Sequence, residues 1–153
     1  MTEHDARERL QEVLERVAEA TGVEVDVEVR DEDGGLVGEF VGDDVALLIG
    51  RHGQTIDAIQ HLAYRIAMQG ESERRSVTVD AAGYRERRAE ALRATADQAV
   101  EAALGDNRAV PLEPMTALER KVIHEHLKGR HDIETYSEGQ EPARRLVVAP
   151  VVE

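Results

Sequence analysis

The sequence contains no cysteine among its 153 residues. Disulfide bonds, thiolate zinc sites and thiol catalysis are therefore excluded. Long apolar runs are also missing, because no stretch approaches the roughly 20 apolar residues that a membrane-spanning helix needs. The first residues, 1–5, are polar and acidic, unlike a signal peptide. These absences predict a cytoplasmic protein with no integral membrane segment.

Aromatic side chains are scarce. The chain has one phenylalanine, three tyrosines and no tryptophan, at Phe40, Tyr64, Tyr84 and Tyr136. The core must therefore be built from aliphatic side chains. Proteins that bind single strands by stacking bases on exposed rings would find few positions to use in this chain.

Positive charge is in short supply as well. The formal net charge is −13, and only Lys121 and Lys128 of the 19 basic residues are lysines. Such an excess of acid argues against nucleic acid as a ligand, because phosphate binding requires cations. However, residues 1–42 hold 13 acidic and 4 basic residues, a net −9, which leaves only −4 for residues 43–153. A locally basic surface in the later part of the chain is therefore compatible with the composition.

Hydrophobic periodicity predicts an α+β protein with two modules. The order is α-β-β-α-α-β followed by a long helix and then β-α-β-β. The expected helices cover 5–20, 45–49, 54–68, 84–104 and 116–128, and the expected strands cover 23–30, 36–41, 74–80, 108–112, 132–137 and 144–149. Gly22 and Gly129 are expected at helix C-termini. The segment 81–83 is the expected boundary, which gives modules of residues 1–82 and 83–153.

Local signals add detail to this assignment. Valines alternate with charged residues over 23–30, which predicts a strand with one buried face and an acidic outer face. A turn at 33–35 would join it to the next strand as a hairpin. Asp43 or Asp44 is expected to cap the short helix. Thr116 is expected to form a capping box with the glutamate three residues later.

The first candidate site is the segment Gly50-Arg51-His52-Gly53, followed by Gln54. Glycines allow a backbone to pass close to a ligand. Unpaired N–H groups at the start of the next helix favour an anion, and Arg51 and His52 would add donors and charge. Taken alone, the pattern is more often a plain helix–helix turn.

The second candidate site is a row of cations on one helix. Arg120, His124 and Lys128 are spaced four residues apart, so they share a helix face and could contact phosphates and bases. An isolated row of this kind is more often a solvated helix surface.

The segment 48–60 around the first site resembles the signature of KH domains. In that family, the Gly-x-x-Gly loop clamps the nucleotide backbone. The order of elements is similar to the type II arrangement of prokaryotic KH domains. The resemblance implies that Gly50 to Gly53 contact the backbone and that Ile49 and Ile56 shape the groove for bases.

The second site resembles the R-three-H domain, which is named for an arginine and a histidine separated by three residues. The resemblance rests on residues 120–124, 135–139 and 141–145. It implies binding of single-stranded nucleic acid, RNA or DNA, with Arg120 and His124 as the signature pair. The neighbours expected on the sheet are Ser137, Gly139, Arg144 and Arg145.

A KH module followed directly by an R-three-H module resembles the bacterial Jag family, also called KhpB, over essentially the whole chain. Many members carry a further N-terminal domain and a linker, and this chain is expected to be a short form without them. The resemblance implies RNA-linked regulation of cell elongation or envelope growth. It also implies pairing with a small single-KH protein, or a homodimer, and a loose link to the membrane-insertase system.

The sequence does not favour an enzyme. His124, His126, His131 and Asp132 do not have the spacing of a zinc-binding motif, and no metal or other cofactor is expected. Ser137 lacks the glycine that a nucleophile elbow needs two residues before it. Two hypotheses remain: a non-catalytic binder of single-stranded RNA, and a protein-interaction adaptor that dimerises through the KH module and binds RNA weakly or not at all.

Overall fold

A computed structural model describes residues 5–152. Residues 1–4, which carry most of the segment that is unlike a signal peptide, lie outside the described residues. The chain forms two compact units, Met1–Arg85 and Glu86–Glu153. This division falls three residues after the boundary that we expected. The α+β class and the order of elements in both units are confirmed.

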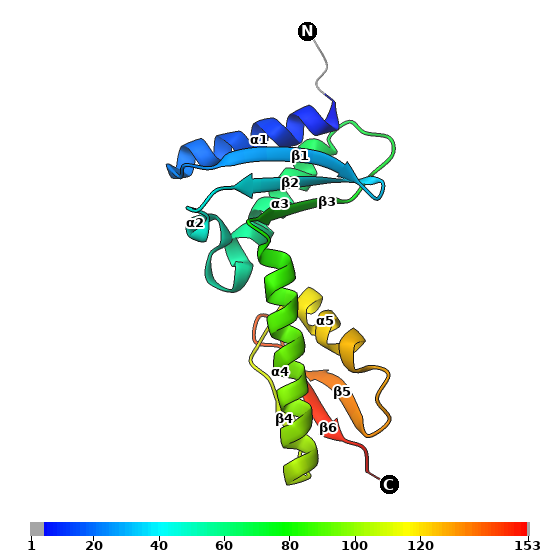
Figure 1. Ribbon diagram of the computed structural model, residues 1–153. Helices are drawn as coiled ribbons and strands as arrows, with labels where there is room; N and C mark the ends of the chain where they lie inside the picture. The colour runs from blue at the N-terminus through cyan, green and yellow to red at the C-terminus, as the bar shows by residue number, and fades with distance from the viewer. Residues whose placement is uncertain (1–4, 153) are drawn as a thin grey trace. The chain divides into compact units, whose positions relative to one another are not determined.

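The first unit contains three main helical segments and a three-stranded sheet (Figure 1). Its elements are α1 (Ala6–Thr21), β1 (Asp26–Glu32), β2 (Gly35–Val41), α2 (Ala46–Ile49), the short 3-10 turn η1 (Arg51–Gly53), α3 (Gln54–Ala67) and β3 (Val77–Ala81). In the sheet, β2 is central, antiparallel to β1 and parallel to β3. Asp5 caps α1 by accepting from the Glu8 amide, and Gly22 ends it in the left-handed conformation.

The core of the first unit lies on one face of this sheet. Leu36 and Phe40 of β2 share that face with Val79 of β3, and all three are at most 1% exposed. Helix α1 packs so closely that a Cβ at Gly38 would overlap the Leu14 side chain. The opposite face is polar and carries Arg30, which pairs with two glutamates of the hairpin. Asp26, Glu28 and Glu32 are exposed on the same face, so the expected acidic outer face is confirmed.

Three local predictions for the first unit are wrong. The first strand begins at Asp26 rather than residue 23, because its partner β2 ends at Val41, opposite Asp26. The third strand likewise begins at Val77 rather than residue 74. Neither Asp43 nor Asp44 caps α2, whose N-cap residue is Val45, with no side-chain hydrogen bond.

The second unit holds two helices against one face of a second sheet. Its elements are α4 (Tyr84–Asp106, beginning in the first unit), β4 (Val110–Pro111), α5 (Ala117–Leu127), β5 (Ile133–Glu138) and β6 (Arg145–Pro150). The sheet is antiparallel, with β6 between β4 and β5. The residues that we expected on the inner face of α4 are confirmed as buried: Leu92, Ala96, Ala99, Val100 and Ala103.

Capping of α5 agrees only in part with expectation. Thr116 caps the helix by accepting from the Glu119 amide at 3.3 Å. The Glu119 carboxylate, however, accepts from Arg88 Nε at 2.9 Å instead of completing a capping box. The C-cap residue is Lys128, and Gly129 does not adopt a positive φ. The fourth strand is also shorter than expected, at two residues.

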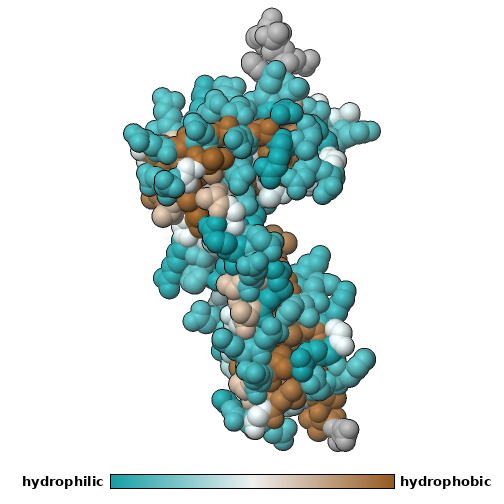
Figure 2. Space-filling model, in the orientation of Figure 1, coloured by the Kyte–Doolittle hydropathy of each residue, from teal (hydrophilic) through white to brown (hydrophobic). Residues whose placement is uncertain are grey.

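The visible surface of each unit is mostly hydrophilic, with apolar residues showing between polar ones (Figure 2). Between residues 5 and 152, no helix has the length and apolar character to cross a membrane.

Candidate nucleic-acid interface

The Gly50–Gly53 loop joins α2 to α3 through an irregular backbone. Gly50 has φ 72° and ψ −177°, His52 has φ 55° and Gly53 has φ 78°. The angles of Gly50 are almost confined to glycine. A Cβ at Gly50 would in addition overlap the Thr55 side chain. The loop therefore requires glycine at Gly50 for both conformational and steric reasons.

Gly50→Ala is expected to lower the free energy of unfolding by about 2 kcal/mol, the cost of a strained backbone position. Gly70→Ala is the matched control, because Gly70 also has a positive φ, of 82°, but a Cβ there would meet nothing within 4 Å. The control should lose only about 1 kcal/mol. Urea denaturation of both variants, followed by circular dichroism, measures the difference. Equal losses would show that the Thr55 overlap has no cost.

The loop exposes its polar side chains. Arg51, His52 and Gln54 are exposed, whereas Gly53 is buried. No acidic side chain of the described chain pairs with Arg51 or His52. No side chain caps the N-terminus of α3, although the Gln54 amide already donates to the Arg51 carbonyl. The loop therefore offers unpaired positive charge next to the positive end of a helix dipole.

The two isoleucines expected to shape a groove for bases differ in their burial. Ile49 is partly exposed at the end of α2, next to the loop. Ile56 is completely buried in the core of the first unit, so it cannot contact a base, and the expectation that it shapes the groove is wrong. Ile59 and Ala63, which lie at helical spacing from Ile56, are also buried, so Ile56 lies on the inner face of α3.

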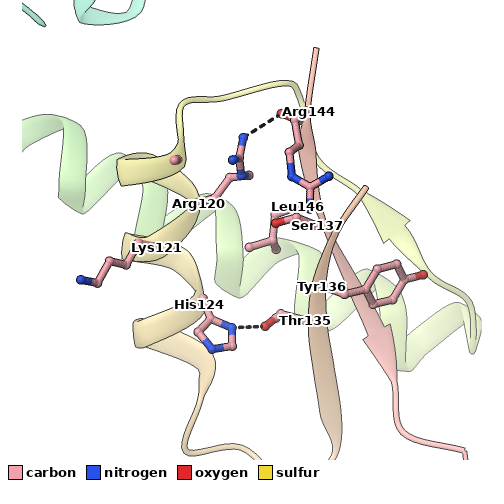
Figure 3. A pocket seen from close by; sticks show the side chains of 9 residues that line it. Arg120, Lys121, His124, Thr135, Tyr136, Ser137, Arg144 and Leu146 are labelled. Atoms are coloured by element: carbon pink, nitrogen blue, oxygen red, sulfur yellow. Dashed lines mark hydrogen bonds between the residues drawn. The ribbon is translucent and has the colours of Figure 1, made fainter. Parts of the chain in front are cut away.

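The second candidate site is an open pocket of about 480 Å³ between α5 and the end of the second sheet (Figure 3). Of the residues that we predicted at this site, four line the pocket: Arg120, His124, Ser137 and Arg144. The other lining residues are Ala117, Lys121, Thr135, Tyr136 and Leu146.

Arg120 is the one buried charged residue among those described, with 8% of its surface exposed. Its Nη1 donates to the Met115 carbonyl at 2.8 Å and to the Arg144 carbonyl at 3.4 Å. Its Nη2 donates to Glu141 Oε1 at 2.8 Å. The guanidinium thus ties α5 to the segment before it and to the loop between β5 and β6. This geometry favours Arg120 as a positioning residue for the pocket rather than as an exposed phosphate ligand.

His124 lies one helical turn beyond Arg120 and faces β5. Its Nδ1 forms a hydrogen bond with Thr135 Oγ1 at 2.6 Å, so the imidazole is held over the strand (Figure 3). Arg144 is held by the turn between β5 and β6, since its Nη1 donates to the Gly139 carbonyl at 2.7 Å. Gly139 itself, with φ 87°, forms the turn between the strands.

Two predicted cations do not line this pocket. Lys128 pairs with Glu125 at 2.6 Å, and Arg145 pairs with Glu138 at 2.8 Å. The hydrogen bond from Lys128, together with its charge, lowers the pKa of the Glu125 carboxyl, and His124 lowers it further by a smaller amount. Both cations are therefore already neutralised by carboxylates.

Lys121 and Tyr136 are two of the five lining residues that the sequence interpretation did not name as site residues. Lys121 lies three residues before His124, so helical spacing would have placed the two on neighbouring positions of α5. Tyr136 is 46% exposed and is the one tyrosine of the described chain with a largely exposed ring. Its side chain projects from β5 in the direction opposite to Thr135 (Figure 3).

The histidines and Asp132 do not converge. His126 forms a hydrogen bond with Asp97 of α4 at 2.9 Å, and Asp132 pairs with Arg130 at 2.8 Å. Over residues 5–152, no three side chains of the histidine, cysteine or acidic type are grouped so that they could hold a metal ion.

Comparison with known proteins gives matches over both units. The family model for the KH domain of KhpA/KhpB matches residues 7–79, and that for the R-three-H domain matches residues 90–150. RNA-binding protein KhpB of Clostridium symbiosum is 35% identical over 140 residues, which are 90% of this chain and 63% of that protein. The chain belongs to the KhpB family. RNA-binding protein KhpB of Bacillus subtilis is 36% identical over 138 residues, 89% of this chain and 66% of that protein.

A third KhpB, from Lactiplantibacillus plantarum, is 41% identical over 103 residues, 67% of this chain and 32% of that protein. The chain spans just under two thirds of the length of the first two KhpB proteins. The identification of the family as Jag/KhpB is thus confirmed. None of the names of these relatives, and neither family model, describes an enzyme.

Proposed function

We propose that this protein is a non-catalytic binder of single-stranded RNA with two contact surfaces, one in each unit. The first is the loop of residues 50–54. The second is the pocket in which Lys121, His124, Ser137 and Arg144 are reachable and Arg120 holds the walls in place. RNA binding is part of the name of the KhpB relatives, and both surfaces suit a phosphodiester backbone.

The observation that carries this proposal is the location of the unpaired cations. Most arginines and lysines between residues 5 and 152 form ion pairs with carboxylates. Arg51, Lys121 and Arg144 form none, and they lie at the two candidate surfaces. Arg65 and Arg74, also without an ion pair, lie elsewhere on the first unit. In a chain of net charge −13, unpaired cations at these two surfaces concentrate positive potential where phosphate would bind.

Tyr136 supplies a different kind of contact. An exposed ring at the edge of the same pocket suits base stacking, which is worth about 1–3 kcal/mol per base and tolerates any sequence. We propose that a strand held at Lys121 and Arg144 places one base on this ring. The same chemistry would accept single-stranded DNA at this surface.

The finer parts of the proposal rest on membership of the family. They are a KH module of residues 1–82, an R-three-H module of residues 83–153, and a small single-KH protein or a second copy of the chain as partner. They also include action in the cytoplasm on RNA linked to cell elongation or envelope growth.

The double variant Arg51→Asp with His52→Asp tests the loop. Both side chains are exposed, and aspartate tolerates the left-handed backbone at His52, so the fold should be retained. Like-charge repulsion with phosphate should lower affinity for a short random-sequence RNA about tenfold at low salt and flatten the salt dependence. Fluorescence anisotropy at several salt concentrations measures both, with circular dichroism as the control for folding. Unchanged affinity would show that the loop is not a binding surface.

The adaptor hypothesis is favoured by a different observation. Leu47 of α2 and Leu62 of α3 are 59% and 50% exposed, which leaves apolar side chains available to a protein partner. If the chain bound no RNA at low salt but dimerised, with dimerisation lost on Leu47→Glu or Leu62→Glu, the adaptor hypothesis would replace RNA binding.

A further inference from the structure

The Gly-x-x-Gly loop is in contact with a residue far along the chain. The backbone of Gly53 lies against the ring of Tyr84, the first residue of α4. A Cβ built at Gly53 would lie 2.7 Å from Tyr84 Oη and 2.8 Å from Tyr84 Cε1. Distances below 3 Å are not tolerated between such atoms, so no side chain fits between the loop and the ring. The Tyr84 hydroxyl is itself buried. The ring therefore packs directly against the backbone of Gly53, the last residue of the loop.

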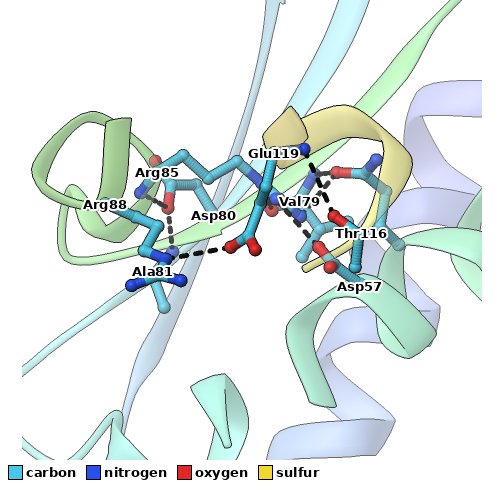
Figure 4. A network of polar contacts seen from close by, with 9 residues as sticks. Asp57, Val79, Asp80, Ala81, Arg85, Arg88, Thr116 and Glu119 are labelled. Atoms are coloured by element: carbon cyan, nitrogen blue, oxygen red, sulfur yellow. Dashed lines mark hydrogen bonds and ion pairs between the residues drawn. The ribbon is translucent and has the colours of Figure 1, made fainter. Parts of the chain in front are cut away.

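The next residue, Arg85, donates hydrogen bonds to α3, the helix that follows the loop (Figure 4). Its Nη1 donates to Asp57 Oδ1 at 2.9 Å and its Nη2 donates to Gln60 Oε1 at 2.9 Å, and both acceptors lie on the first two turns of α3. Its Nε donates to the Val79 carbonyl at 2.8 Å, which connects the same guanidinium to β3. One side chain thus holds the start of α3 against the end of the sheet.

The loop has few internal contacts that could replace these. Two backbone hydrogen bonds close it, one from the Gly53 amide to the Gly50 carbonyl at 3.3 Å and one from the Gln54 amide to the Arg51 carbonyl. Three of its four residues have positive φ, and such backbone persists only when its surroundings hold it. Tyr84 contacts the last residue of the loop, and Arg85 contacts the start of α3.

We infer that the first turn of α4, through Tyr84 and Arg85, sets the geometry in which the loop binds RNA. This inference rests on the proposed function of the loop. Neither residue is proposed to touch the ligand: Tyr84 supports Gly53 from below, and Arg85 positions α3, whose N-terminus faces the phosphate. Because binding and support act on the same backbone, RNA at the loop and docking of this turn stabilise each other.

A double-mutant cycle between Tyr84 and Arg51 tests the inference in the full chain. Tyr84→Ala should lower affinity for a short random-sequence RNA about tenfold, roughly the loss of one well-placed phosphate contact. Arg51→Ala should do the same alone but add less than about twofold in the Tyr84→Ala background, because coupled residues are not additive. Tyr84→Phe, which keeps the ring, should retain affinity. If Tyr84→Ala does not fold, Tyr84→Leu carries the same expectation.

Tyr64→Ala is the matched control for stability. Tyr64 packs against the same core from α3, whereas the atoms nearest to a Cβ at Gly53 all belong to Tyr84. Its removal should therefore destabilise the unit without changing affinity in conditions where the variant is folded. Arg85→Gln should lower affinity in the same direction as Tyr84→Ala. Additive effects of Tyr84→Ala and Arg51→Ala, or equal losses in Tyr64→Ala, would overturn the inference.

Different results would contradict the loop as an RNA surface and the role of the first turn of α4. If Arg51→Ala alone leaves affinity unchanged, the loop is not an RNA surface and the proposed function fails there. If Arg51→Ala weakens binding while Tyr84→Ala and Arg85→Gln do not, the loop binds RNA and only the role of α4 is overturned.

Discussion

Replacing Arg120 with alanine is expected to lower the free energy of unfolding of the second unit by about 3 kcal/mol. The side chain is 10% exposed and donates to the Met115 carbonyl and to Glu141. Its removal leaves a cavity and a buried carbonyl without that donor. Arg120→Lys should recover little of the loss, because one ammonium group cannot span acceptors that a planar guanidinium reaches together.

Arg145→Ala is the control for this prediction. Arg145 also forms an arginine–glutamate pair, with Glu138, but its side chain is 44% exposed. Exposed pairs contribute little, so the loss should stay below about 0.5 kcal/mol. Urea denaturation or calorimetry of the three variants gives the comparison. A loss at Arg120 no larger than that at Arg145 would mean that the signature arginine is not structural and would return it to the role of ligand.

The second large effect is expected when the unpaired cations of the pocket are reversed. The double variant Lys121→Glu with Arg144→Glu should lower affinity for single-stranded RNA by at least about tenfold at low salt. The slope of log affinity against log salt should also decrease in magnitude, by up to about two counterions. Titrations of labelled RNA at four or five salt concentrations measure both quantities.

Lys128→Glu with Arg145→Glu is the matched control, because it makes the same change in net charge. Both of these cations already pair with carboxylates, and neither lines the pocket. We expect less than about a threefold loss from the control. Equal losses in the two double variants would mean that total charge, and not the pocket, determines RNA binding.

Local signals were sufficient for much of the fold. Helix α1 could be predicted from apolar residues at helical spacing, with Gly22 to end it, and the inner face of α4 from the spacing of Leu92 and its neighbours. These features depend on residues that are close in sequence. Strand limits could not be predicted in the same way, because a strand begins where a distant partner is available: β1 begins opposite the last residue of β2.

The candidate sites show the same division. The Gly50–Gly53 loop and the Arg120–His124 pair were recognised as motifs. The spacing of residues on a helix, however, does not predict which other segments cover or pair with their side chains. Burial of Arg120, pairing of Lys128 and Arg145, and inclusion of Tyr136 depend on strands brought to α5 from further along the chain.

By itself, the amino-acid sequence determined the α+β class, the order of the elements, the family and the positions of both motifs, since periodicity and motif spacing are local. Only the tertiary structure decided which cations remain unpaired and which residues support the motifs. Arg120 meets Glu141, and Arg85 meets Asp57, across 21 and 28 positions of the chain. Contacts at such separations are created by packing, and packing separates the arginine that holds the pocket together from the cations that remain without a carboxylate partner.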